Sequence, residues 1–307
     1  MCIRDRAGVA LLIGLPLLIG LVGFTTWRVV GAALAPVESI RSEVASIGAT
    51  DIANRVPVPA SGDEVAGLAT TMNKMLDRLE GAQRQQRRFV SDASHELRSP
   101  LAAIRQHAEV AEAHPDRTTP RALARVVLAE EDRLERLVDD LLLLARSDEG
   151  GLGLRRAVVD LDDLALDEAH RTATPGLLIG TTGVDTTRVV GDATLLRRAI
   201  RNLVDNAARH AVRRVEVSTR TDGGTAVISV HDDGPGVPPE HRDSVFRRFV
   251  RLDDSRSTTD GGAGLGLAIT RDIVAAHDGC VTIGDSPLGG AAVTIELPKR
   301  EVEDRPA

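Results

Sequence analysis

Aromatic side chains and cysteines are scarce in this chain, and both shortages exclude functions. Tyrosine is absent and aromatic residues make up 2% of the 307 residues, which argues against surfaces that stack nucleic acid bases. The two cysteines, Cys2 and Cys280, match no metal-ligand spacing and cannot form a disulfide framework. The formal net charge of −7 lacks the basic excess of a nucleic-acid binder. We therefore expect no nucleic-acid partner. The length of the chain allows two or three domains.

One long apolar run lies near the N-terminus. Ala7 to Trp27 is a run of 21 uncharged residues, long enough to span a membrane as a helix. Trp27 and Arg28 are typical of a membrane interface. A signal peptide is the alternative, because Arg4 and Arg6 precede the run, but the run exceeds the apolar part of such peptides. The charged stub before it resembles non-native sequence, so we expect that an upstream membrane helix and an extracytoplasmic sensing domain are missing.

Two amphipathic helices are predicted directly after this run. Residues 31–49 keep apolar side chains at helical spacing, and residues 51–62 contain the prolines and glycine of an extended connector. A second helix is predicted from Asp63 and Glu64, whose acidic side chains suit a helix N-terminus, through Leu79. Such a pair is expected to transmit packing changes rather than to bind a ligand.

A long helix is predicted from about Gly81 to Ala113, and it carries a histidine beside an apolar seam. His95 lies one residue off the seam, so its imidazole should project toward water. Glu96 follows it, and Pro100 removes the N–H that the Glu96 carbonyl would accept, which should bend or loosen the helix. The seam is formed by Val90, Ser94, Leu97, Leu101, Ile104, Ala108 and Ala111.

A second helix with the same seam is predicted at 121–147. The residues of its stripe are Leu123, Val127, Glu130, Leu134, Leu137, Leu141 and Leu144. Two antiparallel helices with narrow apolar stripes cannot bury themselves fully, so we predict a homodimeric four-helix bundle.

The pattern changes to α/β after residue 151. Strands are predicted at 156–161, 188–191, 214–219, 226–232, 280–284 and 291–297, and helices at 162–171, 192–211 and up to His277. On the second helix Asn202 and Asn206 are four residues apart and share a face, and an amide oxygen suits a hydrated Mg²⁺. Asp232 ends a strand before a glycine turn, where its carboxylate could accept the hydrogen bond of an adenine amino group. Each feature alone is also compatible with an ordinary surface or turn.

A glycine-rich turn at 261–266 opens the last helix. Free N–H groups and the helix dipole at such a turn can hold phosphate, although this turn lacks the lysine of a P-loop and the preceding strand of a dinucleotide-binding fold. The polar segment 251–260 before it fits a lid from which Arg256 could reach phosphate.

In order and spacing, these segments resemble a membrane-bound sensor histidine kinase of a two-component system. HELRSP from His95 resembles the phosphoacceptor box, NLVDNAARH from Asn202 the asparagine box, and FRRF from Phe246 the phenylalanine box. DDGPGVP from Asp232 and GAGLGLAI from Gly262 resemble the two glycine boxes. The connector region resembles a HAMP relay in Pro36, Glu64, Leu68, Asn73 and Met75.

The resemblance implies roles for individual residues. His95 would be the phosphorylated nucleophile and Glu96 its base. Ser99 stands where relatives often carry Thr or Asn, a position linked to dephosphorylation of the partner, so the strength of phosphatase activity stays open. Asn206 would bind Mg²⁺, and the remaining residues of the ATP site would be Asn202, Arg209, Asp232, Gly234, Gly236, Arg256, Gly262, Gly264 and Gly266.

The resemblance also implies fold, partners and place in the cell. The ATP-binding domain would be a two-layer α/β sandwich, and the cofactors ATP and Mg²⁺. The chain would form a homodimer in the inner membrane with cytoplasmic catalytic domains, and a separate response regulator would receive the phosphoryl group. The expected domains are a transmembrane helix at 7–30, an all-α HAMP-like relay at 31–84, the phosphotransfer hairpin at 85–150, the ATP-binding domain at 151–300 and a tail at 301–307.

Alternative interpretations remain open. His107 and His114 are further histidines on the same helix, but neither has the sequence context of His95. The chain could also be a non-catalytic dimeric relay with a nucleotide-binding domain. A third possibility is an ATPase of the wider family that includes gyrase and MutL, against which the paired helices around His95 argue.

Overall fold

The computed structural model describes residues 3–46, 53–60, 62–115, 118–149, 151–252 and 263–299. The chain divides into two compact units, Met1–Val90 and Ser91–Ala307. One helix, α2 (Glu64–Ala113), runs through the boundary between them. The predicted helix that ends at Leu79 and the predicted helix that begins near Gly81 are therefore one continuous helix.

The first unit contains α1 (Ile3–Ser46), a connector and the start of α2. Its small core consists of Ile40, Val56, Ala69 and Leu76. Asn73 fixes the connector, because its side-chain amide donates to the carbonyl of Val56 and accepts from the N–H of Val56, both at 2.9 Å. Extended chain at 54–59 and a helix that begins at Glu64 match the predicted connector and second helix.

The apolar run lies within α1, where large side chains between Leu15 and Val30 are exposed. Within the described residues, no helix combines the length and the apolar content that a membrane crossing needs. The transmembrane helix expected at 7–30 is therefore not confirmed and stays a prediction.

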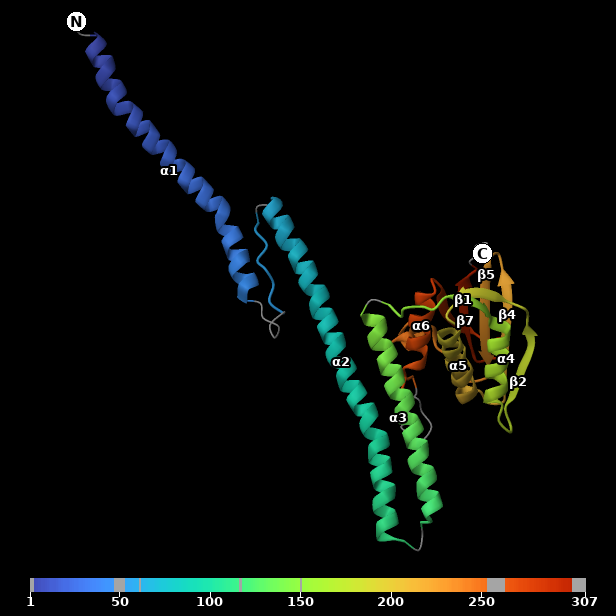
Figure 1. Ribbon diagram of the computed structural model, residues 1–307. Helices are drawn as coiled ribbons and strands as arrows, with labels where there is room; N and C mark the ends of the chain where they lie inside the picture. Colours follow the sequence, from blue (N-terminus) through green and yellow to red (C-terminus); the bar gives the residue numbers. More distant parts are fainter. Residues whose placement is uncertain are drawn as a thin grey trace, which may run out of the picture. The chain divides into compact units, whose positions relative to one another are not determined.

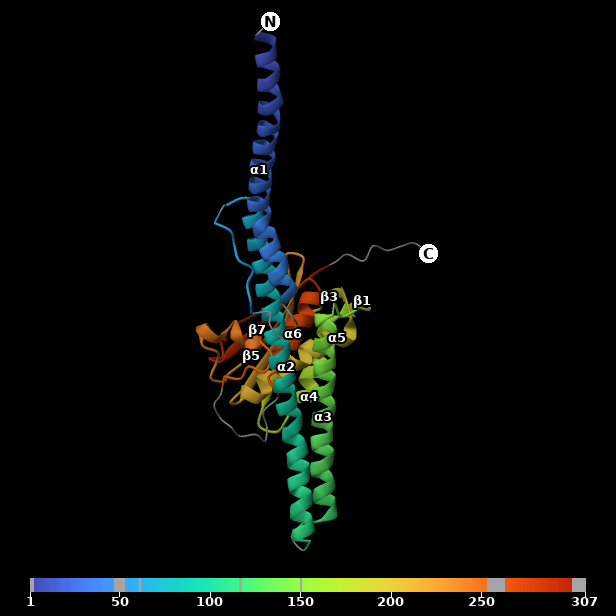
Figure 2. The ribbon, with the colours of Figure 1, turned by 90° about the vertical axis from the view of Figure 1, so that its left-hand side faces the viewer.

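The second unit begins with a helical hairpin. The C-terminal part of α2, from Ser91, runs antiparallel beside α3 (Pro120–Asp148) in both views (Figure 1, Figure 2). Thr119 caps α3 by accepting a hydrogen bond from the N–H of Ala122, and Pro120 occupies the first turn, where a missing N–H does no harm. The seam predicted for α3 is confirmed, because all seven of its residues are buried or half-buried.

The seam predicted for α2 is confirmed only in part. Leu97 and Ile104 are half-buried, whereas Ser94, Leu101 and Ala108 are exposed in this single chain. The buried positions at this level are Ala93 and Pro100. Two neighbouring stripes are therefore present on the helix, one against α3 and one uncovered.

The α/β part of the second unit is built on a five-stranded sheet of order β2-β4-β5-β7-β6. β2 pairs with β4 in parallel, and the other pairs are antiparallel. These strands are β2 (Leu178–Val184), β4 (Arg214–Asp222), β5 (Thr225–Asp232), β6 (Cys280–Asp285) and β7 (Ala291–Pro298). A separate antiparallel ribbon pairs β1 (Ala157–Asp160) with β3 (Arg188–Gly191).

Three helices pack against this sheet and complete the predicted two-layer α/β sandwich (Figure 1). They are α4 (Leu161–Thr172), α5 (Ala193–His210) and α6 (Gly266–Ala276), and two short 3₁₀ turns lie at Pro239–His241 and Ser244–Phe246. The core between the layers contains Ile200, Leu203, Ile228 and Ile269, each at most 1% exposed. β2 is the one strand of the described α/β part that the sequence pattern did not predict.

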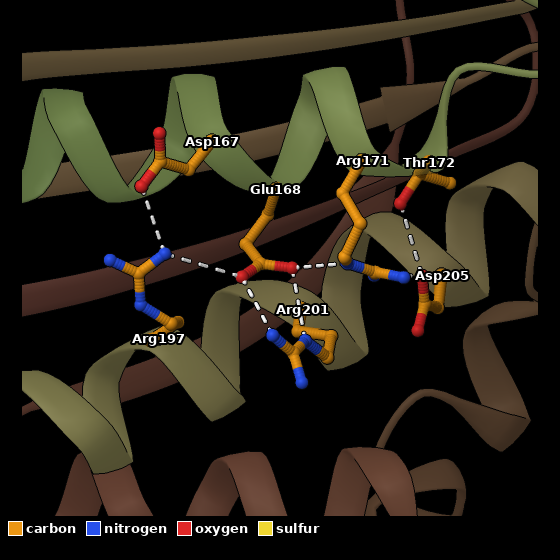
Figure 3. Close-up of polar contacts among 7 residues, drawn as sticks. All are labelled: Asp167, Glu168, Arg171, Thr172, Arg197, Arg201 and Asp205. Atoms are coloured by element: carbon orange, nitrogen blue, oxygen red, sulfur yellow. Dashed lines mark hydrogen bonds and ion pairs between the residues drawn. The ribbon is translucent and has the colours of Figure 1, made fainter.

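A buried carboxylate joins α4 to α5. Glu168 on α4 is 2% exposed and lies among three arginines (Figure 3). Arg171 donates to it at 2.6 Å, Arg201 of α5 at 3.0 and 3.1 Å, and Arg197 of α5 lies 3.6 Å away. Burial works to raise the pKa of Glu168, but the hydrogen bonds from Arg201 and Arg171 outweigh it and lower this pKa. The cluster therefore fixes α5 on the side opposite to its asparagines.

Candidate active site

The carboxylate of Asp232 is buried at the end of β5, and one of its oxygens is already fixed by the backbone. Oδ1 accepts hydrogen bonds from the N–H of Gly234 at 2.9 Å and of Ala291 at 3.1 Å. The side chain is 4% exposed, yet no described residue donates to Oδ2. Two backbone donors thus hold one oxygen and set the plane of the carboxylate, and the other oxygen keeps its capacity to accept from a ligand.

Glycines make close backbone approaches around this carboxylate. A Cβ at Gly234 would lie 2.4 Å from the carbonyl oxygen of His210, and a Cβ at Gly290 would lie 2.2 Å from Oδ1 of Asp232. Gly236 has a φ of +73°, which favours glycine over other residues. Sequence reasoning found Gly234 and Gly236 but missed Gly290, whose only sequence signal was a glycine pair just before the last strand.

Helix α5 forms a common wall of the site. Its C-terminal end lies against Gly234, as the close approach to His210 shows, and Asn202 donates to the carbonyl of Gly266 at 3.1 Å. Asn206, one turn after Asn202, is half-buried, and its side chain makes no hydrogen bond with the described residues. The structure therefore brings both predicted asparagines, the end of β5 and the start of α6 to one side of α5.

The residues next to this wall differ in their roles. Arg209 is exposed at the end of α5. Asp233 accepts hydrogen bonds from the N–H groups of Val212 and Arg213, and the Arg213 N–H is the main reason that the pKa of Asp233 is lowered. Asp233 thus stabilises the turn after α5, while its neighbour Asp232 faces the site.

The glycine turn before α6 is held by the segment after Phe246. Gly264 has a φ of +69°, and a Cβ there would lie 3.0 Å from the carbonyl oxygen of Val250. Its own carbonyl accepts from the N–H of Phe249, a non-glycine residue with a φ of +61°. Gly266 begins α6 and has ordinary space for a Cβ. Arg256 and Gly262, both predicted to belong to the site, lie outside the described residues.

His95 is exposed on the hairpin, as predicted from its position off the seam. Glu96 is half-buried beside it, and Ser99 is exposed one turn later. The helix continues unbroken through Pro100, which is buried. In the described part of the chain, no hydrogen bond or ion pair joins His95 or Glu96 to the α5 wall. The structure therefore contains two separate candidate centres. One is the exposed His95, and the other is the buried carboxylate of Asp232 with Gly234, Gly236 and Gly290 around it, called the cradle below.

The residue types of the cradle are compatible with an adenine nucleotide. A buried carboxylate with one fixed and one available oxygen can accept from an amino group, and the missing Cβ atoms at Gly234 and Gly290 let the surrounding backbone pack closely against this carboxylate. Half-buried amides on α5 and N–H groups at the start of α6 lie beside it, where they can face phosphate oxygens and a hydrated cation.

Comparisons with known protein families agree with this organisation. Residues 191–301 match the family of histidine kinase-, DNA gyrase B- and HSP90-like ATPases. Residues 85–150 match the His Kinase A (phospho-acceptor) domain, and residues 28–81 match the HAMP domain. The three matches follow one another in the order that the motifs predicted.

Curated relatives share this order over most of the chain. The signal transduction histidine-protein kinase BaeS of Escherichia coli is 36% identical over 91% of this chain and 60% of its own length. The sensor protein CutS of Streptomyces coelicolor is 37% identical over 89% of this chain and 67% of its own length. The chain thus spans about 60–67% of the length of these relatives.

A solved structure agrees in fold. The histidine kinase AdeS of Acinetobacter baumannii superposes with a TM-score of 0.54 over 67% of this chain and 98% of its own, at 22% sequence identity. At that identity the likeness supports the fold, which includes the helical hairpin and the α/β sandwich. The three family matches and the similarity to CutS lead to one conclusion: the chain belongs to the two-component sensor histidine kinases.

Proposed function

We propose that this protein phosphorylates its own His95 with ATP and passes the phosphoryl group to an aspartate of a separate response regulator, under the control of a membrane signal. The observation that carries the proposal is the presence, in one chain, of an exposed histidine on a helical hairpin and a glycine-lined cradle around the buried Asp232. The first is a nucleophile open to a partner, and the second fits the donor of a phosphoryl group.

His95 acts as the nucleophile of this reaction. A ring nitrogen of the neutral imidazole attacks the γ-phosphorus of ATP, so an N–P bond forms while the bond to the bridging oxygen breaks and ADP leaves. Glu96 accepts a hydrogen bond from the N–H of the far ring nitrogen and, as the base, takes this proton as positive charge develops on the ring. Transfer to the regulator breaks the N–P bond and forms an acyl phosphate on the receiving aspartate.

The residues of the cradle and of α5 position the substrate. Asp232 accepts the hydrogen bond of the adenine amino group, and Gly234 and Gly236 allow the backbone to approach the ring. Asn202, Asn206 and Arg209 lie toward the triphosphate, with Gly264 and Gly266 at the phosphate end. Mg²⁺, held through Asn206, would neutralise phosphate charge during transfer. Arg256 and Gly262 belong to the same proposal as lid residues.

A homodimer explains the uncovered stripes of the hairpin. Leu101 is 56% exposed, Leu128 59% and Leu142 51%. Exposed leucines at helical spacing on two neighbouring helices are typical of bundle helices that a second hairpin covers. A dimeric four-helix bundle would bury both stripes and keep the off-seam His95 at the surface.

Anchoring to the inner membrane completes the proposal. The uncharged run from Ala7 to Trp27 would cross the membrane, and the HAMP-like unit would carry the signal to the hairpin in the cytoplasm. The relatives are sensor proteins, and the exposed apolar side chains of α1 between Leu15 and Val30 support this anchor. Ser99 keeps a hydroxyl one turn after His95, which is compatible with phosphatase activity toward the regulator.

The test is autophosphorylation of the full chain in detergent with Mg²⁺ and γ-labelled ATP. We expect acid-labile, base-stable label on the wild type and none on His95→Gln or Asn206→Ala. His107→Gln is the matched control, because His107 is also exposed on α2, and it should label like the wild type. Label that survives His95→Gln would refute the nucleophile. Nucleotide binding without label in any variant would favour the non-catalytic relay.

A further inference from the structure

The last turn of α3 is tied to the ATP-binding domain by a bidentate ion pair. Both terminal nitrogens of Arg248 donate to the carboxylate of Asp148, each at 2.7 Å. Asp148 is the last residue of α3, and a negative charge is unfavourable at a helix C-terminus. The arginine therefore compensates an acid that the helix itself does not favour.

Arg248 has a second carboxylate within its own domain. Asp272 on α6 accepts from the same guanidinium at 3.4 Å. The side chain of Arg248 is 13% exposed and that of Asp272 is 17% exposed, whereas that of Asp148 is 58% exposed. If Asp148 leaves, the half-buried arginine keeps a counterion, so the opening of this pair does not leave a desolvated charge unpaired. The guanidinium contacts both carboxylates at once, and Asp272 would remain its partner without Asp148.

The backbone next to Arg248 is coupled to the nucleotide cradle. Phe249 has a φ of +61°, a strained value for a side chain of this size. Its N–H donates to the carbonyl of Gly264 at 3.0 Å. The position of a Gly264 Cβ would touch the Phe249 and Val250 backbone, so these two segments lie in direct contact. A shift of the glycine turn must therefore move the segment that carries Arg248.

The ATP-binding domain is held on α3 at more than one point. In the described residues, the ATP-binding domain contacts α3 through α6 and through the pairs Asp148–Arg248 and Asp140–Arg198, and it makes no hydrogen bond or ion pair with His95. Transfer requires the reacting atoms to come within about 3–3.5 Å of each other. Release of the contact with α3 would give the domain more freedom to bring its nucleotide to that distance from a His95 of the proposed dimer.

We propose that the Asp148–Arg248 pair is a nucleotide-released latch, which helps to hold the ATP-binding domain on α3 and opens when a nucleotide binds beside Gly264. As a regulatory step of the kinase this rests on the proposed function. The link between the latch and nucleotide affinity does not depend on kinase activity. If nucleotide binding favours the open latch by some factor, a mutation that opens the latch must increase nucleotide affinity by up to that factor.

The experiment is calorimetric titration of the full chain in detergent with Mg²⁺ and a non-hydrolysable ATP analogue. Asp148→Asn is expected to lower Kd about threefold to tenfold, the range for loss of a partly exposed bidentate pair. Glu149→Gln, the matched control at the neighbouring exposed acid, should leave Kd unchanged. Asp148→Glu, which keeps the negative charge beside Arg248, should bind the analogue with a Kd near the wild-type value.

Initial rates of His95 labelling separate the latch from the proposed function. Asp148→Asn should label faster than the wild type, and Asp148→Glu, which keeps the charge, should label at about the wild-type rate. An unchanged or weaker affinity for the analogue in Asp148→Asn would overturn the latch, even if every variant labels. A chain that shows the affinity shift but no label on His95 would retain the latch and refute the kinase activity.

Discussion

The helical hairpin and the α/β sandwich bury their apolar side chains to very different extents. Of the largest fully buried side chains in the described residues, only Leu144 belongs to the hairpin, and the others lie between Leu161 and Leu297. The hairpin instead exposes Leu101, Leu128 and Leu142. The sandwich therefore completes its own core, whereas the hairpin has apolar surface left for a partner.

This difference matches the work that each part is proposed to do. A nucleotide cradle needs groups held in fixed positions, such as the two backbone donors on Asp232, and a dense core supplies that rigidity. A hairpin that changes its packing in response to a signal needs a weaker, rearrangeable interface. Three changes test the comparison, from the largest expected effect on folding to the smallest.

The largest effect is expected from a cavity in the sandwich. Ile200 on α5 is fully buried, so Ile200→Ala should reduce the free energy of unfolding by about 2–5 kcal/mol. Val158 in the same half is 53% exposed, and Val158→Ala should change it by less than about 0.5 kcal/mol. Denaturant titration measures the change in the free energy of unfolding for each variant, and hydrogen exchange reports how readily α5 opens. Equal changes in the two variants would contradict a rigid core.

An intermediate effect is expected at the buried carboxylate of Figure 3. Glu168→Gln leaves arginines without their shared counterion, at a cost of about 1–3 kcal/mol, below that of a fully buried pair because Arg171 and Arg201 are 41% and 46% exposed. The matched control is Asp167→Asn on the same helix, where the carboxylate is 60% exposed and the change should stay below about 0.5 kcal/mol.

The same carboxylate predicts a pH dependence. Because the folded pKa of Glu168 is lowered from its ordinary 4.5, its stabilisation is present above the unfolded pKa. It is lost as the pH falls through the folded pKa. Thermal unfolding of the wild type should therefore shift to lower temperature as the pH falls below about 4.5, and Glu168→Gln should show a smaller shift. Parallel curves for the two proteins would exclude Glu168 as a source of the acid sensitivity.

The smallest effect on folding is expected from the uncovered stripe of the hairpin. Leu142→Ala removes a side chain that is 51% exposed, so the free energy of unfolding of the single chain should change by less than about 0.5 kcal/mol. The dimer should dissociate more readily, since the leucine is proposed to lie in its interface. Sedimentation analysis measures dissociation, and an unchanged dimer would place the interface elsewhere.

The sequence predicted the elements whose residues form a recognisable local pattern. The strand at 188–191 is found where it was expected, α5 differs from its predicted range only at the ends, and the exposure of His95 followed from its position off the seam. The strand β2 was missed because Leu178–Val184 contains two glycines and no apolar alternation. It is a strand because β4 pairs with it in parallel, a long-range contact that leaves no local pattern.

The residues of the candidate site also fall into those that the local sequence predicted and those that it did not. Asp232, Asn202 and the glycines of the two boxes could be singled out from spacing and residue type, since a turn or a helix face is a local property. Gly290 could not be singled out, because a side chain at this position would clash with Asp232 only once β7 has folded beside it.

The sequence by itself determined the order of the domains, the exposed position of His95 and the residue types of the candidate site, because each depends on residues close together in the chain. Only the tertiary structure decided which oxygen of Asp232 is available, how three arginines hold Glu168, and that Arg248 joins the end of α3 to α6. These contacts connect residues that are far apart in the chain, and no local periodicity encodes them. The sharing of Arg248 between Asp148 and Asp272 is therefore a property of the folded protein.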